Sequence, residues 1–220
     1  MTWSWVMNYR VKVWDLPTRL FHWLLVALFG LMWWSAESGL LLWHTRAGVA
    51  LLVLVLFRLL WGVLGSQTAR FSQFVRGPAA ILRYLRGEHD GVGHNPLGAL
   101  MVLALLAALL VQLGLGLFAV DQDSYTFDGP LAKLLDSELA EQVSEWHAAW
   151  FNVLLGLVCV HLLAIIGYRV LRRENLVKPM LTGHKEVAQP VAQPAFASPW
   201  LALLLLAVVA AVVLGGLALV

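Results

Sequence analysis

Five long apolar runs separated by polar segments dominate the chain, and they cover about residues 18–36, 40–64, 96–120, 145–169 and 198–219. Each run is long enough for a helix of about 20 residues, which is what a hydrocarbon core about 30 Å thick requires. The strands of a transmembrane barrel are only about 10 residues long and alternate in polarity. These runs are longer and continuous. The pattern therefore predicts an all-α integral membrane protein with five transmembrane helices.

Charged residues are distributed unequally over the connections between the runs. Segment 66–95 carries four arginines, and residues 169–178 carry three more with Lys178. Segment 121–145 instead holds seven acidic residues against a single lysine. Because Lys and Arg accumulate on the cytoplasmic side of membrane proteins, the arginine-rich segments are predicted to lie inside. This places the N-terminus in the cytoplasm and the C-terminus outside.

Composition supports the membrane assignment and excludes several kinds of site. Hydrophobic residues make up 60% of the 220 residues and charged residues only 13%, whereas a soluble domain is about half apolar and a quarter charged. The net charge of +2 argues against a nucleic-acid partner. Cys159 is the single cysteine, which excludes an internal disulfide, a cysteine-ligated iron–sulfur cluster and covalent haem attachment through C-x-x-C-H.

Two histidines in the run 145–169, His147 and His161, are fourteen residues apart. In an α-helix, fourteen residues rise about 21 Å and come within about 40° of whole turns. Both side chains therefore lie on one face of one helix, near opposite edges of the hydrocarbon core. Ionisable side chains inside a membrane are costly and are usually functional.

Each of these histidines has a counterpart at its own depth on another helix. His22 and His161 lie toward the cytoplasmic side, and His44 and His147 toward the outer side. Two His–His pairs at two depths are what two six-coordinate haem irons require. The alternatives are hydrogen-bonding histidines near helix ends, another metal site, or a proton relay in a haem-free anchor or transporter.

Three further histidines lie outside this arrangement. His89, His94 and His184 fall in predicted loops or at an edge, where side chains are normally solvated. His94 has other possible roles, because it precedes Asn95 and Pro96 at the start of a helix. It could cap that helix, face a quinone site or replace His22 as a ligand.

Haem propionates need cations nearby, and three arginines meet this need. Arg19 precedes His22 by three residues, Arg46 follows His44 by two, and Arg58 lies deep in the second apolar run. Arg58 is expected to face protein, near a propionate or a quinone at the inner haem. The alternative for all three is snorkelling to the lipid headgroups.

Several segments together resemble the bacterial di-haem cytochrome b561 family, within the group that includes b-type cytochrome subunits of Ni/Fe-hydrogenases. They are VWDLPTRLFHW at 13–23, HTRAG at 44–48, FRLLW at 57–61, GHNPLGAL at 93–100 and YRVLRRENLVKPMLTG at 168–183. His147 and His161, in the run 145–169, complete the resemblance, which covers roughly residues 10–185.

The resemblance implies a four-helix transmembrane di-haem bundle in a bacterial inner membrane, with two b haems. The implied ligand pairs are His22/His161 for the inner haem and His44/His147 for the outer haem. It also implies electron transfer between the quinone pool and a periplasmic redox partner. Superoxide oxidation with quinone as acceptor, and a role as the cytochrome subunit of a larger membrane oxidoreductase, are the alternatives within the family.

The expected organisation is therefore a cytochrome b561-type domain at 10–185, a Pro/Ala-rich linker at 186–197 and a fifth C-terminal transmembrane helix at 198–220. That fifth helix departs from the four-helix pattern of the family. The acidic segment 121–145 is a candidate docking site for a basic periplasmic cytochrome c or another redox subunit. Arg19, Arg58 and His94 favour a quinone site toward the cytoplasmic side.

Overall fold

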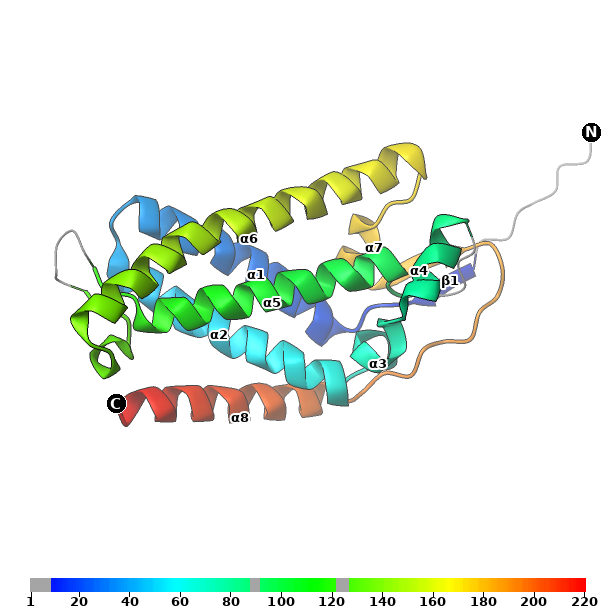
Figure 1. Cartoon of the computed structure of the whole chain (residues 1–220). Coiled ribbons are helices and arrows are strands. Elements are labelled where there is room, and N and C mark those ends of the chain that lie inside the picture. The colour runs from blue at the N-terminus through cyan, green and yellow to red at the C-terminus, as the bar shows by residue number, and fades with distance from the viewer. Residues whose placement is uncertain (1–8, 88–91, 122–126) are drawn as a thin grey trace, which may run out of the picture.

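The protein is a helical bundle in a computed structural model that describes residues 9–87, 92–121 and 127–220 (Figure 1). The helices, in chain order, are α1 Leu16–Glu37, α2 Leu41–Leu64, α3 Phe71–Phe74, α4 Pro78–Leu85, α5 Pro96–Phe118, α6 Ser137–Leu171, α7 Val177–Thr182 and α8 Pro199–Ala218. Single 3₁₀ turns occur at Gln67–Ala69 and Ala132–Leu134. Five of the helices, α1, α2, α5, α6 and α8, are long and apolar enough to span a membrane, which confirms the predicted fold class.

Side-chain caps and prolines fix the starts of these spans. The Asp15 carboxylate accepts a hydrogen bond from the Thr18 amide at 2.7 Å, and the Asn95 side chain accepts one from Gly98 at 2.7 Å. Both caps are followed by a proline in the first helical turn, where the missing N–H has no helical partner to lose. These local signals therefore set the starts of α1, after Asp15, and of α5, after Asn95.

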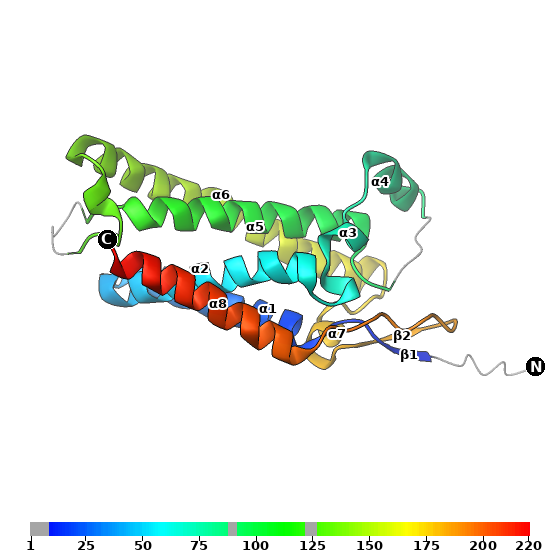
Figure 2. The same ribbon diagram turned by 90° about the horizontal axis from the view of Figure 1, so that it is seen from below.

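The second span lies at the centre of the bundle. Helix α2 packs against α1, α5 and α8, while α6 packs mainly against α5. Trp61 and Val55 of α2 are fully buried, and Leu109 of α5 and Leu154 of α6 belong to the same core cluster. Figure 2 shows α8 lying along α2, so that the fifth helix belongs to the bundle.

The two ends of the bundle differ. One end, which we call the arginine-rich end, carries α3, α4, α7 and a two-stranded sheet (Figure 1). In this sheet β1 Tyr9–Lys12 pairs antiparallel with β2 His184–Val187, in the register Tyr9↔Val187 and Lys12↔His184. The opposite end, the acidic end, carries residues 119–121 and 127–136 and the C-terminus (Figure 1).

The structure adds to the sequence-based organisation in three places. The two short strands were not expected in an all-α chain, and they hold the two ends of the predicted b561-type domain together. Helix α6 begins at Ser137, capped by Asp136, so its first turns belong to the segment expected as an acidic connection. The expected linker is docked, since Ala195 and Gln67 exchange hydrogen bonds of 2.9 Å and Ala197 donates to Ser66 Oγ at 3.1 Å.

Candidate functional site

The predicted outer histidines lie opposite each other. His44, in the first turn of α2, and His147, in the acidic third of α6, have ring centroids 6.2 Å apart and ring planes at 88°. A metal–imidazole bond of about 2.0–2.1 Å, plus roughly 1.1 Å from nitrogen to ring centre, gives about 6.3 Å for two rings on opposite sides of one metal. The separation of His44 and His147 therefore fits a shared iron.

Hydrogen bonds fix the ring tautomers of this pair. Nδ1 of His44 lies 2.9 Å from the Met32 carbonyl oxygen, and Nδ1 of His147 lies 3.0 Å from the Gln112 carbonyl oxygen. A carbonyl only accepts, so in each ring the Nδ1–H donates and Nε2 keeps its lone pair. Such a carbonyl contact is the usual orienting partner of a metal-ligating histidine.

Helix α5 provides the seat on which His147 lies. The buried Gln112 side chain donates to the His147 carbonyl oxygen at 3.1 Å and also to Nε2 of His147 at 3.3 Å, a second contact that a metal bound at this Nε2 would replace. One turn further, a Cβ on Gly116 would come within 2.8 Å of Cε1 of His147. Gly116 is therefore required for this close approach, whereas a Cβ on Gly114 would meet nothing within 4 Å.

The predicted inner histidines, His22 and His161, come from α1 and α6. The Trp23 ring lies edge-on to His22 with a 5.0 Å centroid separation. Nδ1 of His22 is buried and finds no hydrogen-bond partner among the described residues. Buried ring nitrogens are rarely left in this state, so His22 has a free donor–acceptor group where a ligand is expected.

Arg58 is the most deeply buried of the three predicted arginines. Its side chain is 3% exposed, and its guanidinium lies 5.1 Å from the Phe71 ring centroid and 5.9 Å from that of Phe21. Nη1 has no hydrogen-bond partner in the described part of the chain. Arg58 therefore does not snorkel; it faces protein, as expected of a cation that serves an internal anion.

Arg19 and Arg46 lie nearer the ends of the bundle. Arg19 donates from Nε to the Met180 carbonyl oxygen at 3.3 Å and from Nη2 to that of Leu181, which ties α1 to α7. Arg46 is exposed at the acidic end, with its guanidinium 6.0 Å from the Trp43 ring centroid. Arg46 therefore remains accessible, whereas two N–H groups of Arg19 are hydrogen-bonded to the protein.

The prediction that His94 is solvated is wrong. Its ring lies 4.5 Å from the ring centroids of both Trp14 and Phe74, and its Nδ1 is buried without a partner. Burial and the Arg58 charge lower the pKa of His94 to about 3. Asn95, not His94, caps α5. Sequence alone gave no sign of this burial, because Trp14 and Phe74 are far from His94 along the chain.

The structure describes one of the other two loop histidines. His184 lies in β2, with Nδ1 2.9 Å from the Thr182 carbonyl oxygen, and His89 lies outside the described residues. Within the ranges 9–87, 92–121 and 127–220, no three His, Cys, Asp or Glu side chains come together as a site for a bare metal ion. His44 and His147 instead face each other as a pair, which suits a cofactor that brings its own further ligands to the metal.

Comparison with known proteins identifies the family of the chain. The family model for prokaryotic cytochrome b561 matches residues 13–183. A probable Ni/Fe-hydrogenase B-type cytochrome subunit from Bradyrhizobium diazoefficiens is 25% identical over 163 residues, in a match that covers 65% of this chain and 65% of the relative. No solved structure matches the chain significantly. The chain therefore belongs to the prokaryotic cytochrome b561 family of membrane b-type cytochromes.

Proposed function

We propose that this protein is a di-haem cytochrome that passes electrons across a bacterial inner membrane. The observation that carries the proposal is the His44–His147 pair, with a 6.2 Å centroid separation and both Nδ1 atoms held by carbonyl oxygens. His161 lies about 21 Å further along α6 and supplies, with His22, the second pair. The two pairs make two redox sites at different depths.

Each group of residues has a separate task in this proposal. Haem, when bound, supplies reversible one-electron chemistry. His44 and His147 hold the outer iron, and His22 and His161 hold the inner iron. Arg58 provides a buried positive charge near the inner pair, and Arg46 an accessible one near the outer pair. A cation stabilises the propionates of the group it faces and favours its reduced form.

The proposed orientation follows from the charges at the two ends. The arginine-rich end is cytoplasmic and the acidic end periplasmic by the positive-inside rule. We place quinone toward the cytoplasmic side, where Arg58 is buried, His94 is partly buried and Arg19 lies, and the redox partner at the periplasmic side.

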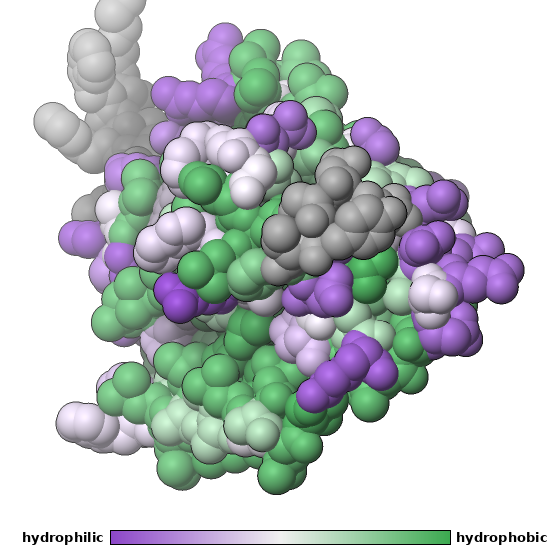
Figure 3. Space-filling view, turned by 90° about the vertical axis from the view of Figure 1, so that its left-hand side faces the viewer, coloured by the Kyte–Doolittle hydropathy of each residue, from purple (hydrophilic) through white to green (hydrophobic). Residues whose placement is uncertain are grey.

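The acidic end offers a surface for a basic partner. Asp136, Glu138, Glu141 and Glu145 follow one another around the start of α6. Figure 3 looks onto this end, where hydrophilic and apolar side chains alternate. Attraction between exposed charges is screened by salt. Reduction of a basic cytochrome c should therefore slow as ionic strength rises, and a rate independent of salt contradicts electrostatic docking.

Haem stoichiometry tests the di-haem assignment. The purified protein is expected to hold two haems per chain by pyridine haemochrome, and His161→Ala about one, with the outer haem retained. Cys159→Ala, a substitution on α6 two residues away, is the control and should keep both. Two haems in the His161 variant would overturn the ligand assignment, and a spectrum without a Soret band would favour a haem-free anchor or relay.

A second candidate, the cytochrome subunit of a larger membrane oxidoreductase, is favoured by the hydrogenase subunit among its relatives. The match covers 65% of that relative's length, so a hydrogenase partner for this chain is a proposal. In that case, hydrogen added to native membranes that contain the protein should reduce its haems. Reduction by quinol but not by hydrogen would favour the independent carrier.

Superoxide oxidation with quinone as acceptor is the remaining alternative. Arg46 favours it, because it is an exposed cation two residues from a proposed outer ligand. Stopped-flow mixing of the oxidised protein with superoxide tests it directly. Fast haem reduction that slows in Arg46→Gln would support this activity, and no haem reduction would exclude it.

A further inference from the structure

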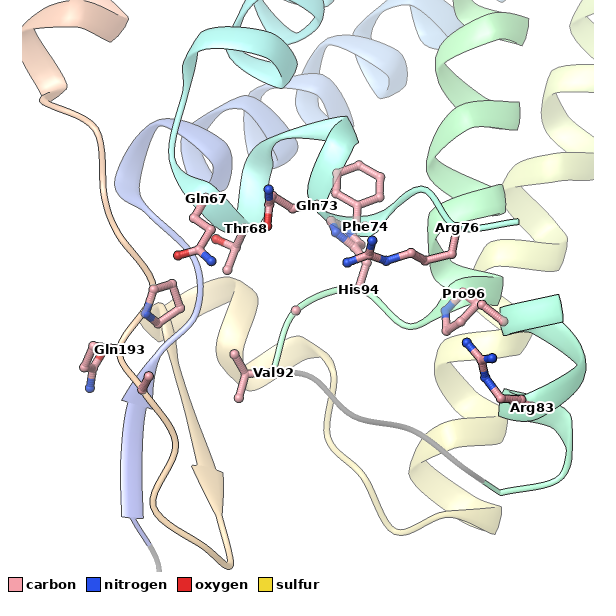
Figure 4. A pocket seen from close by; sticks show the side chains of 14 residues that line it. Gln67, Thr68, Gln73, Phe74, Arg76, Arg83, Val92, His94, Pro96 and Gln193 are labelled. Atoms are coloured by element: carbon pink, nitrogen blue, oxygen red, sulfur yellow. The ribbon is translucent and has the colours of Figure 1, made fainter. Parts of the chain in front are cut away.

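A polar pocket at the arginine-rich end is separate from both histidine pairs. It has a volume of about 420 Å³ and lies between α3, the start of α5 and the docked segment 192–194 (Figure 4). This volume is within the range of about 300–1,000 Å³ typical of small-ligand sites. The pocket is therefore large enough for a ligand with a compact polar head.

The charged side chains that line this pocket, among the residues that the structure describes, have one sign. Arg76 and Arg83 line it together with His94 and Gln73, and none of the described residues that line it is Asp or Glu. Neither arginine forms an ion pair within the described residues. The sheet beside it differs, since there Lys178 pairs with Glu186 at 2.8 Å and Lys185 with Glu174 at 2.7 Å. Two unpaired guanidinium groups around one hollow are typical of an anion site.

Hydrogen bonds on two sides hold the walls of the pocket in place. On one side the Tyr84 hydroxyl of α4 bonds the Tyr168 hydroxyl of α6, which also accepts from Asn95 Nδ2 at 2.9 Å. This contact fixes the helix that carries Arg83. On the other side the reciprocal bonds between Gln67 and Ala195 hold the docked segment. The helix that carries Arg83 and the segment 192–194 are thus both tied to the bundle by hydrogen bonds.

The surroundings of Arg83 indicate the depth of the pocket in the membrane. Leu82 and Leu85 of α4 are 56% and 61% exposed while Tyr84 is buried, so α4 presents apolar side chains outward. A short amphipathic helix of this kind lies at the level of the lipid headgroups. The phosphates of the lipids are the anions found at that depth.

We propose that this pocket binds the phosphate group of an anionic lipid, through Arg76 and Arg83 with His94 and Gln73 as further polar contacts. Planar guanidinium groups bind phosphate oxygens in pairs. Neutral His94 leaves a ring nitrogen available for a hydrogen bond to the ligand. The bound headgroup would bridge α3, α4 and the docked segment that leads to α8.

The test uses the full-length protein in a neutral detergent and counts bound lipid by native mass spectrometry. One phosphatidylglycerol is expected to bind saturably, with phosphatidylcholine at least about tenfold weaker. Arg76→Gln/Arg83→Gln should weaken phosphatidylglycerol at least about tenfold, since it removes two charge-assisted contacts. The control Arg86→Gln/Arg169→Gln, which removes two exposed arginines outside the pocket, should change binding less than about twofold.

Three results would overturn the proposal. Equal losses in the two double variants would show diffuse attraction, and equal binding of phosphatidylcholine would show no selection for an anion. Displacement of phosphatidylglycerol by a water-soluble quinone would assign the pocket to a quinone. Competition with inorganic phosphate distinguishes a lipid headgroup from free phosphate as the ligand. If millimolar phosphate displaces the lipid, the site is one for phosphate itself. If it does not, the lipid is the ligand.

Discussion

At the scale of single residues, glycines on one helix have different roles. Gly116 lies against the His147 ring, whereas Gly114, half a turn away on α5, faces open space. Both lie in the same helix, so a substitution has nearly the same effect on helix propensity at either position. A comparison of the two positions therefore tests the contact between Gly116 and the proposed outer ligand His147.

Gly116→Val is accordingly expected to displace His147 and lower the haem content from about two to about one per chain. Gly114→Val is the matched control and should keep about two. Pyridine haemochrome gives the stoichiometry, and a redox titration identifies which haem is lost. Equal haem contents in the two variants would mean that Gly116 does not support the ligand.

His94 makes stability depend on pH. Its pKa is about 3 in the folded protein because of burial and the Arg58 charge, against about 6.5 for an ordinary histidine. As pH falls below about 6.5, His94 binds a proton in the unfolded chain but stays neutral in the folded protein. Its contribution to stability is therefore complete above about pH 6.5 and is lost as the pH falls toward 3.

The measurement is the free energy of unfolding in detergent at pH 7 and pH 5. The wild type should lose about 1–2 kcal/mol over this interval through His94. His94→Phe keeps a ring between Trp14 and Phe74 but cannot bind a proton, so its loss should be smaller by that amount. The same pH dependence in both proteins would contradict the assignment to His94.

At the scale of elements, the start of α1 is tied to α2. The Asp15 carboxylate accepts from the Thr18 amide and, through its other oxygen, from the Trp61 indole at 3.1 Å. Both Asp15 and Trp61 are buried. Asp136 caps α6 in the same way, with a single bond from the Leu139 amide at 2.9 Å, but at an exposed position.

Asp15→Ala should therefore cost more than Asp136→Ala. The first removes a cap, about 1 kcal/mol, and leaves a buried indole N–H unpaired, about 1–3 kcal/mol. The second removes a cap alone. Unfolding in detergent should show a loss of about 2–4 kcal/mol for Asp15→Ala and about 1 kcal/mol for Asp136→Ala. Similar losses would show that the Trp61 bond contributes little.

Local patterns predicted the elements that bury a continuous apolar run, but not those that depend on distant partners. The five long apolar helices and the start of α5 at Asn95 and Pro96 follow from local sequence, and the spacing of His147 and His161 places them on one face of α6. The pairing of β1 with β2 joins four-residue segments about 170 residues apart, and neither has a recognisable strand pattern. The burial of His94 likewise depends on rings from β1–α1 and α3. Tertiary contacts decided these features.

At the scale of the whole molecule, the functional residues and the fifth span are separate. All four proposed ligands belong to α1, α2 and α6, within the matched residues 13–183. Helix α8 packs on α2 through its Ala202 and Val209 side, and both residues are buried. The seat of His147 is on α5, on the other side of α2. The four-helix unit should therefore bind its cofactors without α8.

Deletion of residues 198–220 is expected to keep about two haems per chain but to lower the melting temperature, because the face of α2 that α8 covers becomes exposed to detergent. Haem content and thermal unfolding measure the two effects separately. As a control, Leu204→Ala/Val212→Ala changes the exposed side of α8 and should alter neither. Loss of one haem on deletion would instead make α8 part of the cofactor-binding unit, and the family's four-helix pattern would not be sufficient for this chain.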